Sequence, residues 1–362
     1  MSITVEQATE ALRQVIDPNT GKDLVSSRSA RNIRVDGDSV ILDVELGYPA
    51  VSQVDGIRRA VIAGLKTLPG VANVSANVYQ KIVAHAVQRG VKTLPQVRNI
   101  IAVASGKGGV GKSTTAVNLA LALAAEGASV GLLDADIYGP SQPAMLGITG
   151  RPESADGKTM EPLIGHGLQA SSIGFMIDPD TPMVWRGPMV TQALEQLLRD
   201  TNWRDLDYLV VDLPPGTGDI HLTLAQKIPV TGAVIVTTPQ DIALLDARKG
   251  LKMFEKVGIP ILGVVENMAM HTCTQCGHTE HIFGSGGGER MASQYGVEYL
   301  GGLPLDIRIR EQTDSGRPTV VAAPDSDLAE IYRRIARRVA VRIAEQARYM
   351  SQKFPSIVVQ KT

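Results

Sequence analysis

The chain has 362 residues, of which 44% are hydrophobic and 20% are charged, which is the composition of an ordinary globular protein and a length that suggests two domains. Its 36 basic and 37 acidic side chains leave a net charge of -1, and aromatic residues make up only 4%, so we expect no nucleic-acid partner. The sequence shows neither an apolar run of about 20 residues nor a signal-peptide pattern, so we expect a cytoplasmic protein without stable membrane association.

The first 80 residues predict a small α+β domain. Apolar spacing predicts, in chain order, a helix that ends at residue 16, strands at 33–35 and 40–46, a helix at 54–68 and a strand at 74–78. This order is sufficient for a small sheet covered by two helices. Residues 81–98 are interpreted as a linker, because basic residues there surround a glycine and a proline.

From residue 99 the pattern changes to short, continuously apolar strands that alternate with helices. The predicted strands are 100–104, 130–133, 208–211, 233–236 and 261–265, and the predicted helices are 114–126, 189–199 and 242–257. Residues 99–350 are therefore expected to form a doubly wound α/β domain with a mostly parallel sheet, followed by a C-terminal tail at 351–362. Ligands of such folds bind beyond the carboxyl ends of the strands.

A glycine-rich sequence lies between the first of these strands and the helix that follows it. Gly106-Lys107-Gly108-Gly109-Val110-Gly111-Lys112-Ser113, followed by Thr114, matches the P-loop pattern G-x-x-x-x-G-K-[ST] in its proper context. Glycines there allow backbone N–H groups to turn toward phosphates, and the helix N-terminus adds its positive end. We expect Lys112 to reach the β- and γ-phosphates and Ser113 to place its hydroxyl on Mg²⁺.

Lys107 is a second lysine within this loop. With it the loop resembles the deviant Walker A class, which includes MinD, ParA, the nitrogenase iron protein and Mrp/ApbC. The resemblance implies that the nucleotide is ATP and that Lys107 crosses a dimer interface to the partner's nucleotide.

Two further segments are similar to motifs of this class. Leu133-Asp134-Ala135-Asp136 resembles switch I, in which Asp136 would orient the attacking water. The segment that runs from Leu209 through Asp212 to Asp219 resembles Walker B and switch II, in which Asp212 would hold Mg²⁺. Asn267 matches the position that meets the adenine base. A lone aspartate at a strand end can also be a helix cap, but the order of the sites after a P-loop favours catalysis, with Lys107, Lys112 and Asp136 as catalytic residues.

Cys273 and Cys276 are the two cysteines of the chain, and their C-x-x-C spacing suggests metal or redox chemistry. A thioredoxin-like pair requires a helix N-terminus, whereas polar residues and a glycine flank this pair. A zinc knuckle could add two histidines from His271, His278 and His281. Iron–sulfur ligation prefers four thiolates, which two copies of the chain would supply. Two buried cysteines without a ligand are a further alternative.

Several motifs together make the chain similar to the Mrp/ApbC iron–sulfur cluster carriers over about residues 95–350. These are the deviant P-loop, Leu-Leu-Asp-Ala-Asp-Ile-Tyr-Gly-Pro-Ser at 132–141, Asp-Leu-Pro-Pro-Gly-Thr-Gly-Asp at 212–219, and the C-x-x-C before Ile-Phe-Gly at 282–284. The resemblance implies a homodimer that binds a labile [4Fe-4S] cluster through Cys273 and Cys276 and transfers it to apo-proteins. ATP binding or hydrolysis would set the geometry of the dimer.

The first domain resembles the small iron–sulfur-assembly domain often fused ahead of this ATPase. It contains no cysteine, so we expect a docking role for it rather than cluster binding. For the chain as a whole, the resemblance implies apo iron–sulfur proteins and cluster-assembly scaffolds as partners.

Two other functions are compatible with parts of the sequence. A MinD-like positioning ATPase that cycles on membranes could use a basic amphipathic helix at 328–343, although such a stripe more often packs on its own domain. That class has no use for a cysteine loop. An electron-transfer ATPase of the nitrogenase iron protein type places its cluster cysteines at two separated positions, whereas this chain has one C-x-x-C.

Overall fold

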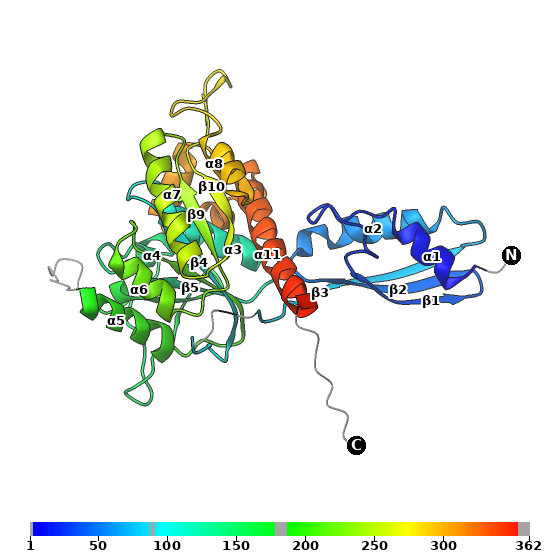
Figure 1. Ribbon diagram of the computed structural model, residues 1–362, viewed down its shortest axis with the longest axis horizontal. Helices are drawn as coiled ribbons and strands as arrows, with labels where there is room; N and C mark the ends of the chain where they lie inside the picture. The colour runs from blue at the N-terminus through cyan, green and yellow to red at the C-terminus, as the bar shows by residue number, and fades with distance from the viewer. Residues whose placement is uncertain (1–2, 86, 88–90, 178–186, 354–362) are drawn as a thin grey trace. The chain divides into compact units, whose positions relative to one another are not determined.

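The computed structural model describes residues 3–85, 87, 91–177 and 187–353 (Figure 1). The chain divides into two compact units, one formed by Met1–Val83 with Ala340–Thr362 and the other by Ala84–Val339. The domain limits at residues 80, 98 and 350 stay predictions.

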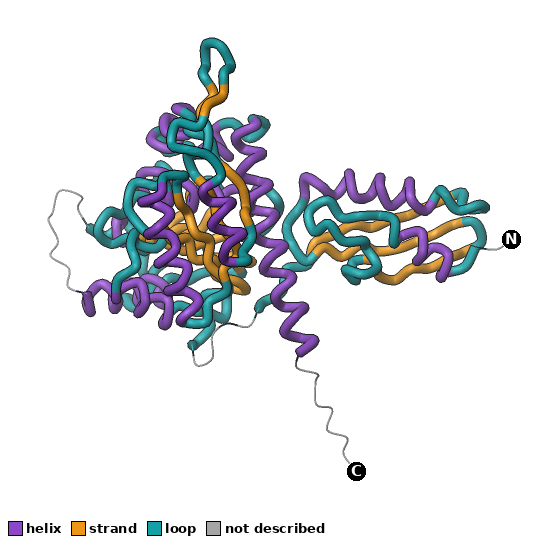
Figure 2. The backbone as a smooth tube through the Cα atoms, turned by 45° about the horizontal axis from the view of Figure 1, so that its top comes forward, coloured by secondary structure: helices purple, strands orange, loops and turns teal. Residues whose placement is uncertain are grey.

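The first unit is a three-stranded sheet with two α-helices on one face (Figures 1 and 2). Its elements are α1 (Val5–Leu12), β1 (Ala30–Asp36), β2 (Ser39–Leu46), the short helix η1 (Val51–Gln53), α2 (Val54–Leu65) and β3 (Asn73–Gln80). Strand β2 lies in the middle, antiparallel to β1 and parallel to β3. Its alternate residues Val40, Leu42, Val44 and Leu46 are all buried, which is why this strand forms the centre of the small core.

The first helix is shorter than the apolar spacing predicts, because it ends at Leu12 rather than at residue 16. Val15 is buried, but Ile16 is 53% exposed and pairs with Asp23 in an isolated bridge. The carboxylate of Asp17 accepts hydrogen bonds from the Asn19 N–H at 2.9 Å and the Tyr48 hydroxyl at 2.7 Å. These contacts stabilise a turn in place of further helix.

The second unit is built around an eight-stranded sheet in the order β13-β10-β9-β4-β8-β5-β7-β6, which confirms the predicted doubly wound α/β fold. Its strands are β4 (Val97–Ser105), β5 (Val130–Asp134), β6 (Leu163–Gly165), β7 (Leu168–Ser172), β8 (Leu206–Asp212), β9 (Gly232–Thr237), β10 (Ile261–Glu266) and β13 (Tyr299–Gly302). Neighbouring strands pair in parallel except β6 with β7.

Helices flank this sheet, as Figure 2 shows. Among them, α3 (Lys112–Ala125), α5 (Gly187–Asp200), α7 (Asp241–Lys256) and α8 (Gly287–Tyr295) contact its strands. The remaining helices of this part of the chain are α4 (Gln142–Met145), η2 (Ile173–Phe175), α6 (Asp219–Lys227), α9 (Ile307–Asp314), α10 (Thr319–Ala322) and α11 (Asp327–Lys353). Because β4, β8 and β5 are adjacent and parallel, the segments that follow them meet at one edge of the sheet.

The C-terminal helix α11 buries its apolar stripe within the protein. Leu328, Ile335 and Val339 are at most 6% exposed. Arg337 on the same helix is also buried and forms an ion pair with Glu126 at 2.5 Å. The stripe that a membrane-bound helix would present to lipid is therefore covered. Within the described ranges, no helix has the length and apolar character needed to cross a membrane.

Candidate functional site: a nucleotide loop and a cysteine hairpin

The phosphate loop runs from the end of β4 to the start of α3 and depends on glycine at two close approaches. Gly111 precedes α3 in the left-handed region, with φ 81°, and a Cβ there would lie 2.1 Å from the Asn267 side-chain nitrogen. A Cβ on Gly106 would lie 2.1 Å from the backbone of Asp246 in α7. Larger residues would therefore displace the loop from its supports.

The remaining residues of the predicted loop take up distinct positions. Gly108 and Gly109 are exposed, Val110 is buried, and Thr114 lies in the first turn of α3. Lys107 is half-buried, and its carbonyl accepts a hydrogen bond from the Ser105 hydroxyl at 2.9 Å. Among the residues that the structure describes, the ammonium group of Lys107 has no acidic partner.

Four residues that the sequence analysis assigned to Mg·ATP chemistry converge beyond β4, β8 and β5. The Lys112 ammonium forms an ion pair with Asp212 and lies 3.1 Å from the Ser113 hydroxyl and 3.8 Å from Asp136. Lys112, Asp136 and Asp212 are all buried. One cation thus faces two carboxylates inside the protein, where charge–charge interactions are strong.

Asp134 is a third buried carboxylate of this group, although the sequence analysis gave the switch I role to Asp136 alone. It accepts hydrogen bonds from the backbone N–H groups of Asp136 at 3.2 Å and Gln142 at 3.0 Å, and from the Ser172 hydroxyl at 3.2 Å. Burial, together with the nearby charge of Asp212, raises the pKa of Asp134 well above its usual range.

Gln142, the first residue of α4, is a site residue that the sequence analysis missed. Its side-chain amide donates to Asp212 Oδ2 at 2.8 Å and to the Ser113 carbonyl at 3.1 Å. The side chain is 1% exposed, and within the described structure its Oε1 has no hydrogen-bond partner. No motif or spacing marks this glutamine, because its partners lie far away in the sequence.

Asn267 follows β10 and contacts the phosphate loop directly. Its backbone N–H donates to the Thr237 carbonyl at 2.7 Å, and its side-chain amide donates to the Val110 carbonyl at 2.8 Å. The predicted adenine position therefore adjoins the loop, and the described contact of its side-chain nitrogen is with backbone.

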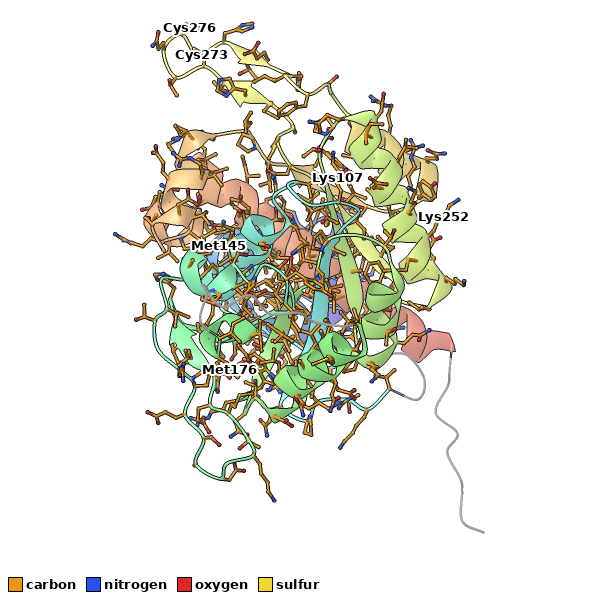
Figure 3. The ribbon with its side chains drawn as sticks, turned by 90° about the vertical axis from the view of Figure 1, so that its left-hand side faces the viewer. Lys107, Met145, Met176, Lys252, Cys273 and Cys276 are labelled. Atoms are coloured by element: carbon orange, nitrogen blue, oxygen red, sulfur yellow. The ribbon has the colours of Figure 1, made fainter. Side chains whose placement is uncertain are left out.

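The two cysteines lie in the turn of a small hairpin formed by β11 (His271–Thr272) and β12 (Thr279–Glu280). Figure 3 shows both at the tip of this hairpin, which projects from the body of the α/β unit that carries Lys107. Cys273 is half-buried and Cys276 is exposed. The N–H groups of Cys276 and Gln275 point toward the Cys273 sulfur and lower the pKa of its thiol, with a smaller contribution from His271.

This geometry bears on the alternatives for the C-x-x-C. The pair occupies a hairpin turn rather than a helix N-terminus, so it lacks the setting of a thioredoxin-like site. In the part of the chain that the structure describes, no three His, Cys, Asp or Glu side chains are grouped so that they could hold a metal ion. Each chain thus offers two accessible thiols on a projecting support, one of them with a lowered pKa.

The sheet topology and the phosphate loop together define a P-loop NTPase. A family model described as NUBPL iron-transfer P-loop NTPase matches residues 96–340, and a model described as iron-sulfur cluster assembly protein matches residues 6–78. The chain belongs to the family of iron-transfer P-loop NTPases, as its motifs indicated.

Similar proteins carry related names. An iron-sulfur cluster carrier protein of Pseudomonas fragi is 61% identical over 75% of this chain and 96% of its own length. One from Haemophilus influenzae is 49% identical over 93% of this chain and 91% of its own. The iron-sulfur cluster transfer protein NUBPL of Mus musculus is 54% identical over 67% of this chain and 77% of its own.

Solved structures agree with the fold. A nucleotide-binding protein from Archaeoglobus fulgidus in complex with ADP is 37% identical, with a TM-score of 0.57 over 64% of this chain and 91% of that chain. The cell division ATPase MinD of Pyrococcus furiosus, at 24% identity, shares the fold with a TM-score of 0.51 over 67% of this chain and 98% of that chain.

Proposed function

We propose that the protein binds a labile [4Fe-4S] cluster between two subunits and transfers it to apo-proteins, while ATP binding and hydrolysis control the dimer. The observation that carries the proposal is the projecting hairpin, which presents Cys273 and Cys276 from a P-loop NTPase of an iron-transfer family. A thiol with a lowered pKa is a better iron ligand, because the thiolate is the ligating form.

The number of ligands supports a shared site. A cluster of this type prefers four thiolates, and one chain has two cysteines. A two-fold axis near the hairpin tips would bring the same pair from both subunits to one cluster. The exposure of Cys276 at the tip is compatible with such an approach. The cluster is cargo here, so an accessible site also suits its release.

The nucleotide site supplies a means of control. Lys112 and the helix N-terminus would bind the phosphates of ATP, and Ser113 and Asp212 would hold Mg²⁺, which supplies charge neutralisation to the phosphates. Lys112 would then exchange its carboxylate partners for phosphate oxygens. Asp136 would orient the attacking water, Asn267 would meet the adenine, and Lys107 would reach the nucleotide of the partner subunit.

The first unit is proposed as the docking site for apo iron–sulfur proteins or cluster-assembly scaffolds. It matches the iron-sulfur cluster assembly model over residues 6–78 but contains no cysteine, so it has no thiolate of its own to offer a cluster. Cytoplasmic location, where thiols stay reduced, is part of the same proposal.

Anaerobic reconstitution followed by iron, sulfide and zinc analysis tests this function. We expect about four iron and four sulfide per dimer, as the cluster type requires. Either Cys273→Ser or Cys276→Ser removes two ligands from the shared site and should abolish stable cluster binding, whereas ATP affinity should not change. Thr274→Ser, within the same turn, is the matched control. One tightly bound zinc per chain and no iron after reconstitution would overturn the proposal in favour of a zinc knuckle.

A further inference from the structure

Two histidine rings at the base of the cysteine hairpin contact backbone carbonyls of the same unit. His281, which follows β12, places its Nδ1 2.7 Å from the Ala269 carbonyl. His271, the first residue of β11, places its Nδ1 3.1 Å from the Leu305 carbonyl. The His281 ring thus links the segment after β12 to the segment before β11. The His271 ring links the start of β11 to the segment after β13.

Both contacts define which ring nitrogen carries the proton. A backbone carbonyl can only accept a hydrogen bond, so Nδ1 must be the donor in His271 and in His281. Each ring is therefore committed through Nδ1–H to the backbone. His278, the third histidine of the loop, is exposed, and its side chain has no hydrogen-bond partner among the described residues.

The same stretch of backbone continues to the phosphate loop. Two residues before Ala269, the side chain of Asn267 donates to the Val110 carbonyl at 2.8 Å. Between them Met268 takes a left-handed conformation, with φ 57°, which is uncommon for a residue with a side chain. Met270, the residue after Ala269, is bound to the segment after β13, because its carbonyl accepts a hydrogen bond from the Leu305 N–H at 2.7 Å.

We infer that His271 and His281 are positioning residues that couple the cysteine hairpin to the nucleotide site. A change in the phosphate loop moves Val110 and Asn267, and the short segment from Asn267 to Ala269 passes this displacement to the base of the hairpin. Because both rings contact backbone at the base of the hairpin, the hairpin moves together with its base rather than independently of it. The inference rests on the proposed function, since it names how the nucleotide state reaches the thiols that hold the cluster.

The test uses the full chain without cluster, iron or zinc, so that it does not depend on cluster loading. The rate at which iodoacetamide alkylates Cys273 and Cys276 is measured with and without a non-hydrolysable ATP analogue and Mg²⁺. In the wild-type chain we expect a difference of about fivefold, the factor that one net hydrogen bond represents. His281→Leu and His271→Leu should each reduce this difference to less than twofold, while His278→Leu should retain it.

Conservative variants separate positioning from ligation. In His281→Asn and His271→Asn the amide nitrogen lies near the place of Nδ1, so these variants should retain most of the nucleotide-dependent difference in alkylation rate. In His281→Gln and His271→Gln the amide nitrogen lies near the place of Nε2, so these variants should lose that difference. This comparison also decides the matter if the leucine variants do not fold. A wild-type rate that is indifferent to the nucleotide, or leucine variants with the full difference, would overturn the coupling. Failure to bind iron would overturn the proposed function and leave these rates unaffected.

Discussion

The side-chain nitrogen of Gln142 lies 2.8 Å from Oδ2 of Asp212, while Lys112 forms an ion pair with the other carboxylate oxygen. The same glutamine nitrogen lies 3.1 Å from the Ser113 carbonyl. One buried side chain at the start of α4 thus connects the phosphate loop with the end of β8. Asp212 is held by a cation on one oxygen and an amide donor on the other, and these two contacts fix the orientation of its carboxylate.

The Gln142→Leu variant tests the role of these two hydrogen bonds. The substitution keeps the side chain's bulk but removes the donor to Asp212, so the carboxylate should be less well oriented toward Mg²⁺. We expect the free Mg²⁺ concentration at half-maximal ATP turnover to rise about fivefold, since one net hydrogen bond represents about 1 kcal/mol. Gln312→Leu in α9 is the matched control and should leave this concentration unchanged. An identical Mg²⁺ requirement in both variants would contradict the role given to Gln142.

Lys112→Ala should reduce Mg·ATP turnover by about 100-fold or more, because it removes the main positive charge on the β- and γ-phosphates. It also leaves buried Asp136 and Asp212 without their cation, so the metal-free variant should unfold at a lower temperature. Steady-state phosphate release and thermal unfolding measure the two effects. Lys256→Ala, an exposed lysine in α7, is the control. Undiminished hydrolysis in Lys112→Ala would show that the loop does not bind the phosphates.

Asp136→Asn should retain ATP binding and slow hydrolysis by about 100-fold, because water orientation contributes in the transition state and not to nucleotide affinity. Equilibrium nucleotide binding and single-turnover hydrolysis separate the two quantities. The exposed Asp325→Asn serves as control. Equal loss of affinity and rate would give Asp136 a structural role, which its 3.8 Å separation from Lys112 also permits.

Asp134→Asn should alter how stability depends on pH. Because burial and the charge of Asp212 raise the pKa of Asp134, the folded state holds a proton that the unfolded state releases near pH 4. The stability of the wild-type chain therefore falls as the pH rises above this value, by about 1.4 kcal/mol per unit by which the pKa is raised. The asparagine variant has no such proton to lose.

Thermal unfolding of metal-free protein from pH 5 to pH 8 measures this difference. The unfolding temperature of Asp134→Asn, taken relative to that of the wild type, should increase as the pH rises. This trend is expected even if the loss of hydrogen bonds makes the variant less stable than the wild type at every pH. Asp325→Asn should run parallel to the wild type. A constant offset between Asp134→Asn and the wild type would show that the carboxyl group does not titrate in this range.

The secondary elements with strong local signals could be predicted from the sequence. Continuous apolar runs at 100–104 and 208–211 indicated buried parallel strands, and both lie at the centre of the sheet. Strands β7 and β13 were missed, because Leu168–Ser172 is mostly polar or small and Tyr299–Gly302 is short and contains two glycines. Such segments become strands through pairing with a neighbour rather than through their own preference.

By itself, the sequence determined the chemistry that depends on neighbours along the chain. The P-loop glycines and Lys112 stand at fixed spacing because a phosphate must be surrounded by consecutive backbone N–H groups, and the C-x-x-C places two thiols on one turn. Only the tertiary structure decided that Gln142 supports Asp212, a residue 70 positions away, and that Asn267 contacts Val110 across 157. These contacts arise where parallel strands end together, and no local pattern records which distant segments the sheet makes adjacent.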